Sequence, residues 1–293
     1  MFGSQQNIIN ISFYAILPAA IILYYVYKRD KFPEPPRVVF ITLLLSFGIA
    51  FPLSFLIPFA EGILERLDFG LESNNFYMSF IRAAFLEETM KFLVLIYYCL
   101  HLDEFDEPMD ALVYGVAASL GFAAFENWEY VIGAANKNIE YAKDVALIRS
   151  FTAVPLHALA GVFMGFFLMD AVFEKEKRKL NLFLSLFFPI CLHGLYNLIL
   201  FSHNISSWWI YILVGVFLVR AFFIFRKERN LQSQRVQNKT KCIPANSDIV
   251  FVITISIFIL IITNYMLNIY IYKNYLNEKT ISSFNTSSIN KLY

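Results

Sequence analysis

Long apolar runs, separated by short polar stretches, dominate the pattern of the chain. A run of about 20 apolar residues is long enough to cross a hydrocarbon core of about 30 Å as a helix. We predict about eight such spans, at approximately residues 8–27, 38–60, 76–100, 109–133, 147–172, 181–201, 207–225 and 249–272. The pattern therefore predicts an all-α fold, a polytopic bundle of transmembrane helices.

A polar stretch divides these spans unequally. Residues 226–248 are rich in Gln, Asn and Lys, which predicts a flexible cytoplasmic linker between a seven-span core (1–225) and one additional transmembrane helix (249–272). The Ser- and Asn-rich residues 273–293 are expected to form a disordered outer tail. The first span has no basic segment before it and Lys28 and Arg29 directly after it, so we expect an uncleaved anchor.

Lysine and arginine collect in alternate loops. With the N-terminus outside the cytoplasm, the cytoplasmic loops hold 14 of these residues and the opposite side holds six. Cytoplasmic loops of membrane proteins carry the excess of basic residues. The sequence therefore predicts a multi-pass protein of the plasma membrane with both termini outside the cytoplasm.

Composition supports the membrane assignment and excludes other classes. Hydrophobic residues make up 58% of the chain, and charged residues make up 16%, against about 25% in soluble domains. The mean hydropathy is +0.56. The net charge of +1 argues against nucleic acid as a partner. The cysteines, Cys99, Cys191 and Cys242, are too far apart for a disulfide framework or a zinc knuckle.

The third predicted span carries two adjacent acids and a base, Glu87, Glu88 and Lys91. A charged side chain at the centre of a membrane helix costs about 2.5–3.5 kcal/mol, so such residues persist when they are paired, hydrated or functional. Lys91 is four residues from Glu87 and three from Glu88, which places it near both. An ion pair between Lys91 and one of the two glutamates neutralises that glutamate and leaves the other carboxylate without a partner. The alternative is a purely structural ion pair.

The fourth predicted span combines a packing stripe with another acid. Glu126 is followed by Asn127, and Tyr130 lies one helical turn further along the same stripe. Small residues recur every four positions, which lets neighbouring helices approach closely: Ala111, Gly115, Ser119 and Ala123.

The fifth and sixth predicted spans each carry a histidine. Arg149 lies near the outer end of the fifth span, and His157 follows Pro155. His193 and Asn197 share a face of the sixth span. The first histidine belongs to a stripe that is expected to pack tightly inside the bundle: Ala153, His157, Gly161 and Gly165.

The depth of these groups indicates a single site. Counted from the outer ends of their spans, Glu87, Glu126, His157 and His193 all lie roughly 10–17 Å below the outer surface, at 1.5 Å per residue. Scattered structural polar residues would not be expected to share one layer. Carboxylates, histidines and an amide in a semi-dry cavity can activate water and stabilise an oxyanion. The same residues also allow an alternative, a zinc site assembled across helices from Glu87, Glu126, His157 and His193.

Five motifs in order carry a resemblance to a known family. They are Arg29–Pro36 (RDKFPEPP), Glu87-Glu88-x-x-Lys91, Gly121-Phe122-Ala-x-x-Glu126-Asn127-x-x-Tyr130, Pro155-x-His157 and His193-Gly194-x-x-Asn197. Over residues 14–201 the chain resembles the PrsW family of bacterial intramembrane proteases, relatives of the type II CAAX endopeptidases.

The resemblance implies an endopeptidase of glutamic type without a cofactor, acting on a single-pass membrane protein, in known members an anti-sigma factor cut in a site-1-like step. It implies that Glu87 activates water with support from Glu88 and Lys91. It also implies that His157, His193 and Asn197 bind water and stabilise the oxyanion. Glu126 stands where the CAAX-type relatives carry histidine, so its role is open. Asn127, Tyr130 and Arg149 are expected to support the site.

Three alternatives remain beside this hypothesis. One is a zinc-dependent protease that uses the same residues. Another is a non-catalytic membrane protein that binds partners through the same cavity, although such a protein would be free to lose the base. The third is a proton-coupled transporter, which the lack of an inverted repeat disfavours. Neither substrate identity nor oligomeric state follows from the sequence.

Overall fold

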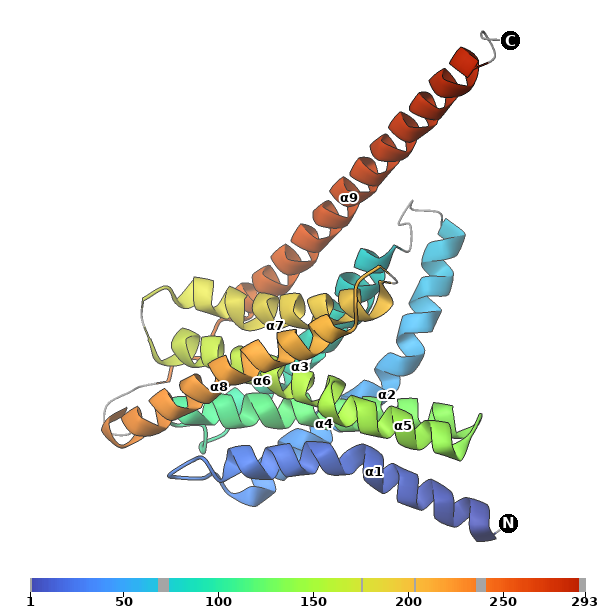
Figure 1. Cartoon of the computed structure of the whole chain (residues 1–293). Coiled ribbons are helices and arrows are strands. Elements are labelled where there is room, and N and C mark those ends of the chain that lie inside the picture. The colour runs from blue at the N-terminus through green and yellow to red at the C-terminus, as the bar shows by residue number, and fades with distance from the viewer. Residues whose placement is uncertain (1, 68–73, 175, 203, 236–240, 290–293) are drawn as a thin grey trace.

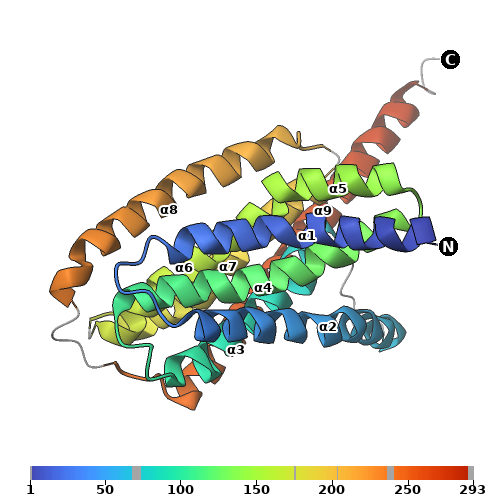
Figure 2. The ribbon, with the colours of Figure 1, turned by 90° about the horizontal axis from the view of Figure 1, so that it is seen from below.

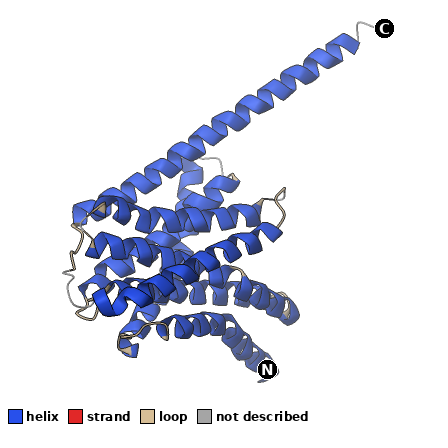
Figure 3. Cartoon of the chain, turned by 60° about the vertical axis from the view of Figure 1, so that its left-hand side comes forward, coloured by secondary structure: helices blue, strands red, loops and turns tan. Residues whose placement is uncertain are grey.

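The computed structural model describes residues 2–67, 74–174, 176–202, 204–235 and 241–289. This part of the chain consists of helices and loops and has no strand (Figure 3), so the all-α prediction is confirmed. The elements are α1 (Phe2–Tyr27), α2 (Pro36–Leu67), η1 (Tyr77–Phe85), α3 (Leu86–Tyr97), η2 (Cys99–His101), α4 (Pro108–Ala135), α5 (Ile139–Phe151), α6 (Ala153–Phe173), α7 (Arg178–Phe201), α8 (Trp208–Arg235) and α9 (Asn246–Ile289).

Seven helical segments among the described residues are long and apolar enough to cross a membrane. They correspond to the predicted spans with the exception of the third. That segment is helical but divided into the π-helix η1 and the α-helix α3, and it carries Arg82, Glu87, Glu88 and Lys91. Its inward face is nevertheless fully buried, at Phe92 for example, because it packs against α2, α4 and α7.

Helix α4 is the central element of the bundle. It packs against α1, α2, α5 and α6, and the helices α1, α4 and α2 lie side by side (Figure 2). Its apolar stretch is entirely buried, whereas α1, α8 and α9 keep most of theirs on the outside. The outer helices therefore present the lipid-facing surface of the bundle, and α4 supplies residues to its interior (Figure 1).

Helices α4 and α6 approach backbone to backbone. A Cβ atom built on Gly115 would lie 2.5 Å from the carbonyl oxygen of Gly161, and one on Gly161 would lie 2.7 Å from the Ser119 hydroxyl. A Cβ on Gly165 would collide with the backbone of Ala111. Both predicted small-residue stripes thus meet in one close contact, which brings His157 next to α4.

The fifth predicted span is a longer helical segment with a break. It runs from Ile139 to Phe173, and Thr152 separates α5 from α6. The break lies just before Pro155, whose ring nitrogen cannot donate to the carbonyl of Phe151 four residues earlier. The helical segment begins at Ile139, about eight residues before the predicted boundary at 147.

The predicted linker and tail differ from the structure in their helical content. Helix α8 continues through residue 235, and Gln232 is buried in a segment that we expected to be a flexible linker. Helix α9 continues to Ile289, into the expected disordered tail, because no glycine or proline interrupts residues 246–289. Residues 236–240 and 290–293 lie outside the described residues.

The loops predicted for the cytoplasmic side gather at one end of the bundle. The Lys31 N–H donates to Gln232 Oε1 over 3.1 Å. The Lys241 ammonium donates to the carbonyl of Leu102 over 2.6 Å. These contacts join the α1–α2 loop, the loop before α4 and the region around α8, as the alternating direction of the spans requires.

Candidate active site

The two adjacent acids lie directly after a change of helix type. The π-helix η1 ends at Phe85, and Glu87 and Glu88 occupy the first turn of α3. A π-helix has a wider turn than an α-helix and is rare outside functional regions. Gly194 of α7 lies against Phe80 of η1 so closely that a Cβ there would overlap the Phe80 ring. This contact fixes α7, and with it His193, beside the start of α3.

Glu88 is buried and neutralised from two sides. The Lys91 Nζ donates to Glu88 Oε1 over 2.7 Å, and His193 Nδ1 lies 2.8 Å from the same oxygen. Both Glu88 and Lys91 are fully buried. Because a carboxylate only accepts hydrogen bonds, His193 Nδ1 carries the proton of this contact. In a neutral His193 the Nε2 atom then keeps a free lone pair.

Lys91 also links Glu88 to a second histidine. Its Nζ lies 2.8 Å from His157 Nδ1, and His157 Nε2 lies 2.7 Å from Glu126 Oε2. An ammonium group only donates, so Nδ1 accepts and the proton of a neutral His157 sits on Nε2, from which it donates to Glu126. Both ring nitrogens of His157 are therefore engaged, and a chain of polar contacts runs from α3 through α6 to α4.

Arg149 holds the other end of this chain. Its guanidinium lies 3.2 Å from Glu126 Oε1, and its Nε donates to Asn127 Oδ1 over 2.8 Å. The Asn127 amide in turn donates to the carbonyl of Ala15 in α1 over 2.6 Å. The Arg149 guanidinium also stacks on the Tyr130 ring at 4.0 Å from its centroid. Glu126 is thus held by a planar cation that also contacts Asn127 and Tyr130.

Glu87 differs from the other two acids in its partners. Its Oε2 lies 3.8 Å from Lys91 Nζ and 4.0 Å from His193 Nδ1, both too long for a hydrogen bond. This oxygen is buried and has no hydrogen-bond partner among the described residues. Lys91 is engaged with Glu88, and Arg149 with Glu126. Glu87 is therefore the most weakly neutralised carboxylate of the three.

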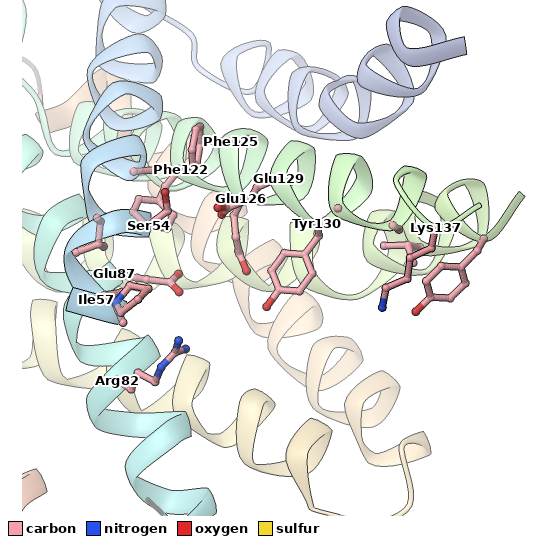
Figure 4. A pocket seen from close by; sticks show the side chains of 17 residues that line it. Ser54, Ile57, Arg82, Glu87, Phe122, Phe125, Glu126, Glu129, Tyr130 and Lys137 are labelled. Atoms are coloured by element: carbon pink, nitrogen blue, oxygen red, sulfur yellow. The ribbon is translucent and has the colours of Figure 1, made fainter. Parts of the chain in front are cut away.

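Glu87 lines a cavity of about 570 Å³ between α2, η1, α3, α4 and α5. Figure 4 shows the Glu87 and Glu126 carboxylates pointing into the same space from α3 and α4, with Arg82 of η1 beside them. Residues of α2, among them Leu53 and Ile57, form an apolar wall. The volume lies within the range of about 300–1,000 Å³ that is usual for ligand sites.

The structure brings together most of the residues selected from the sequence. Glu87, Glu126, His157 and His193 form one cluster with Glu88 and Lys91, and the two imidazole rings lie 4.9 Å apart. Asn197 is buried on α7 one turn from His193. Tyr130 is half exposed at the cavity.

Sequence reasoning missed Arg82 and the α2 wall of the cavity. Arg82 was the one basic residue in the apolar run before Glu87, a signal that would have singled it out. The α2 wall consists of ordinary apolar residues and carries no signal of its own.

A cluster of acids, histidines and a lysine beside a cavity, inside a bundle of membrane-spanning helices, fits the class of membrane-embedded hydrolases. Comparison with known proteins shows the family to which the chain belongs. Residues 34–224 match the family described as PrsW family intramembrane metalloprotease. The chain belongs to this family, and it is a multi-pass membrane peptidase, a hydrolase acting on peptide bonds.

Several relatives share most of their length with the chain. Protease PrsW of Bacillus subtilis (strain 168) is 34% identical over 220 residues, which are 74% of this chain and 94% of the relative. Protease PrsW of Geobacillus kaustophilus (strain HTA426) is 33% identical over 208 residues, 70% of this chain and 84% of the relative. Protease PrsW of Clostridioides difficile (strain 630) is 31% identical with the same coverage. No solved structure matches the chain.

Proposed function

We propose that the chain is an intramembrane endopeptidase of glutamic type, in which Glu87 activates a water molecule to cleave a membrane-anchored protein. The observation that carries this proposal is the difference between the two adjacent acids. Glu88 is held by Lys91 and His193, whereas Glu87 lines the cavity and its Oε2 has no hydrogen-bond partner among the described residues. A general base needs a lone pair within reach of its water, and Glu87 has one.

The remaining residues assist this step in distinct ways. Glu87 takes a proton from water, the water oxygen attacks the scissile carbonyl carbon, and the proton passes from Glu87 to the departing amine as the C–N bond breaks. The free His193 Nε2 orients the water as a hydrogen-bond acceptor. The Asn197 amide, one turn away, is the candidate donor to the oxyanion. His157 has no free nitrogen, so we assign it a positioning role between Lys91 and Glu126.

A zinc-dependent mechanism is the second candidate, and two observations favour it. The family description includes the word metalloprotease, and Glu87, His157 and His193 each offer one ligand atom within 4.8 Å of the others. These residues fit the ligand preference of zinc. Bound zinc would polarise the scissile carbonyl and make water a better nucleophile near neutral pH. His157 could bind it only by giving up Lys91 or Glu126 as a partner.

We infer that the substrate is a single-pass membrane protein, of which an anti-sigma factor is the example that the family resemblance supplies. The cavity supports this inference because it opens beside the apolar wall of α2, where an unwound segment of a transmembrane helix can reach Glu87. Both termini are proposed to face away from the cytoplasm, following the distribution of basic residues. Reporter fusions at the two termini test this orientation, and a cytoplasmic signal from either one contradicts it.

The test of mechanism combines cleavage with metal analysis. The full chain, purified in detergent, is mixed with a tagged single-pass anti-sigma factor, and its metal content is measured before and after chelation. Glu87→Gln is expected to lower the cleavage rate by about 10²–10⁴-fold, whereas Glu140→Gln, a change at an exposed acid of α5, leaves it unchanged. Full cleavage by metal-free protein eliminates the zinc mechanism. Loss of cleavage on chelation and its recovery with stoichiometric zinc overturn the glutamic one.

A further inference from the structure

Five carboxylates gather at the other end of α4, far from the active site. Asp30 and Glu34 come from the α1–α2 loop, Asp106 and Glu107 from the end of the loop before α4, and Asp110 from the first turn of α4; we call these five the carboxylate cluster. Asp110 and Glu126 are 16 residues apart on one helix, which corresponds to about 24 Å. The carboxylate cluster is therefore separate from the site around Glu87.

The oxygens of this cluster form two overlapping sets, and the three oxygens of each set are close enough to share one ion. Asp30, Glu107 and Asp110 each place an oxygen within 4.8 Å of the other two, and so do Glu34, Asp106 and Asp110. Asp110 belongs to both sets. Calcium binds oxygens at about 2.3–2.6 Å, so two ligands of one ion lie at most about 5 Å apart. The observed separations satisfy this limit.

Asp30, Glu107 and Asp110 each have one carboxylate oxygen with a hydrogen bond and one without a partner among the described residues. Asp110 Oδ2 accepts from the N–H groups of Asp106 and Glu107, at 2.9 and 2.7 Å. The Gln232 amide donates to Asp30 Oδ1 and Glu107 Oε1. The other oxygens, Asp30 Oδ2, Glu107 Oε2 and Asp110 Oδ1, are buried without a partner in the described part of the chain. The bonded oxygens therefore hold the carboxylates in place, and the free ones are available to a ligand.

An independent group points to the same place. Tyr114 lies one helical turn after Asp110, its side chain is fully buried, and its hydroxyl has no hydrogen-bond partner among the described residues. Tyr114 and Asp110 are four residues apart and therefore lie on the same face of α4. A buried tyrosine hydroxyl usually finds a partner. Here the hydroxyl stays without a partner on the face of α4 that also carries Asp110.

Within the described ranges, no ion pair balances the buried acids of the cluster. No lysine, arginine or histidine in the described ranges forms an ion pair with Asp30, Glu107 or Asp110. Buried charges are normally paired or bound to a metal, because an isolated one loses several kcal/mol of hydration. We propose that the carboxylate cluster binds a divalent cation that prefers oxygen ligands, of the class of Mg²⁺ and Ca²⁺.

The chemistry of the donors selects this class of ion. The residues that could hold the ion are carboxylates, with no cysteine or histidine among them, and hard cations prefer such oxygen ligands. Asp106 is exposed and leaves a path from solvent. The bound ion joins the α1–α2 loop to the start of α4, and Gln232 extends the connection to α8. The cation thus clamps three segments that are distant in the sequence.

The test measures cation-dependent stability of the full chain in detergent. After treatment with a chelator, its Tm is recorded against MgCl₂ and CaCl₂ at constant ionic strength. A ligand that binds only the folded state raises the Tm in a saturable way. We expect a saturable rise for the wild type and an apparent affinity at least tenfold weaker for Asp110→Asn and Glu107→Gln.

Two control variants assign the effect to this site. Asp103→Asn, at an exposed acid in the same loop, keeps the response of the wild type. Glu87→Gln also keeps it, which excludes binding at the active site. Because Asp110→Asn and Glu107→Gln each remove a charge from a crowded cluster, both variants are expected to fold, and circular dichroism checks this. An unchanged wild-type Tm, or equal responses of wild type and Asp110→Asn, overturns the proposal.

Discussion

Lys91 and His157, 66 residues apart in the chain, meet with Lys91 Nζ 2.8 Å from His157 Nδ1. This contact makes Lys91 the shared partner of two polar groups on different helices, since the same ammonium donates to Glu88 over 2.7 Å. It also determines the tautomer of His157 and, through it, the hydrogen bond to Glu126. Lys91 therefore organises the site as well as neutralising one acid.

Replacement of Lys91 by methionine is expected to destabilise the protein strongly. The change leaves Glu88 as a buried charge without its cation, which costs about 3–5 kcal/mol in comparable pairs. Unfolding by denaturant in detergent measures the loss. The double variant Lys91→Met/Glu88→Gln is expected to recover part of it, because the orphaned charge is removed too. Lys143→Met, at an exposed pair on α5, serves as the control and changes little. Equal effects of the two lysine variants would contradict this role for Lys91.

Gly161→Ala is expected to disturb the contact between α4 and α6. The added Cβ meets the backbone of Gly115 and the Ser119 hydroxyl, so the helices must separate. Overpacking of this kind costs about 1–3 kcal/mol, and the shift of His157 lowers cleavage as well. Gly215→Ala is a matched control, since a Cβ on Gly215 of α8 meets nothing within 4 Å. It is expected to be neutral or slightly stabilising, because alanine favours the helix. Thermal unfolding and cleavage rates compare the two variants, and equal results for both would refute the close-packing argument.

Arg149→Lys is expected to lower cleavage more than stability. A lysine ammonium keeps the charge near Glu126 but cannot contact Glu126 and Asn127 with the fixed geometry of a guanidinium. Displacement of a site group by about 1 Å can cost about 10²-fold in rate. Steady-state kinetics should show the loss in kcat with KM little changed. A change confined to KM would instead indicate that Arg149 binds substrate.

The stability of chelated protein is expected to fall as the pH rises from about 4.5 to 7. Burial raises the pKa of Glu107 and of Glu34 to about 7, and the nearby carboxylates of Asp30 and Asp106 act in the same direction. The folded state then holds protons that the unfolded state has released, so the stabilisation is complete below the unfolded pKa and is lost as the pH passes through the folded one. Thermal unfolding across this range measures the slope, and Glu107→Gln should reduce it. A wild-type slope of the opposite sign would contradict the assignment.

Local pattern in the chain predicted the class of the protein and most of the residues that the structure brings together in the candidate site. Hydrophobic run length gave the helices, because a membrane span must satisfy its own backbone. The spacing of small residues predicted two closely packing faces, and the structure shows that these faces, on α4 and α6, meet each other. Chain-length counting placed Glu87, Glu126, His157 and His193 at one depth, since helical rise is constant. The structure brings the four together.

Only the tertiary structure decided which of these residues pair with one another. The spacing puts Lys91 near both Glu87 and Glu88. In the folded protein, where His193 also contacts Glu88, Lys91 forms its hydrogen bond with Glu88. The break before α6, the helical extension of α8 and the carboxylate cluster also depend on contacts between distant segments. The physical reason is the same in each case. Periodicity predicts which face of its helix a side chain occupies. Its partner on a neighbouring helix depends on how the two helices pack.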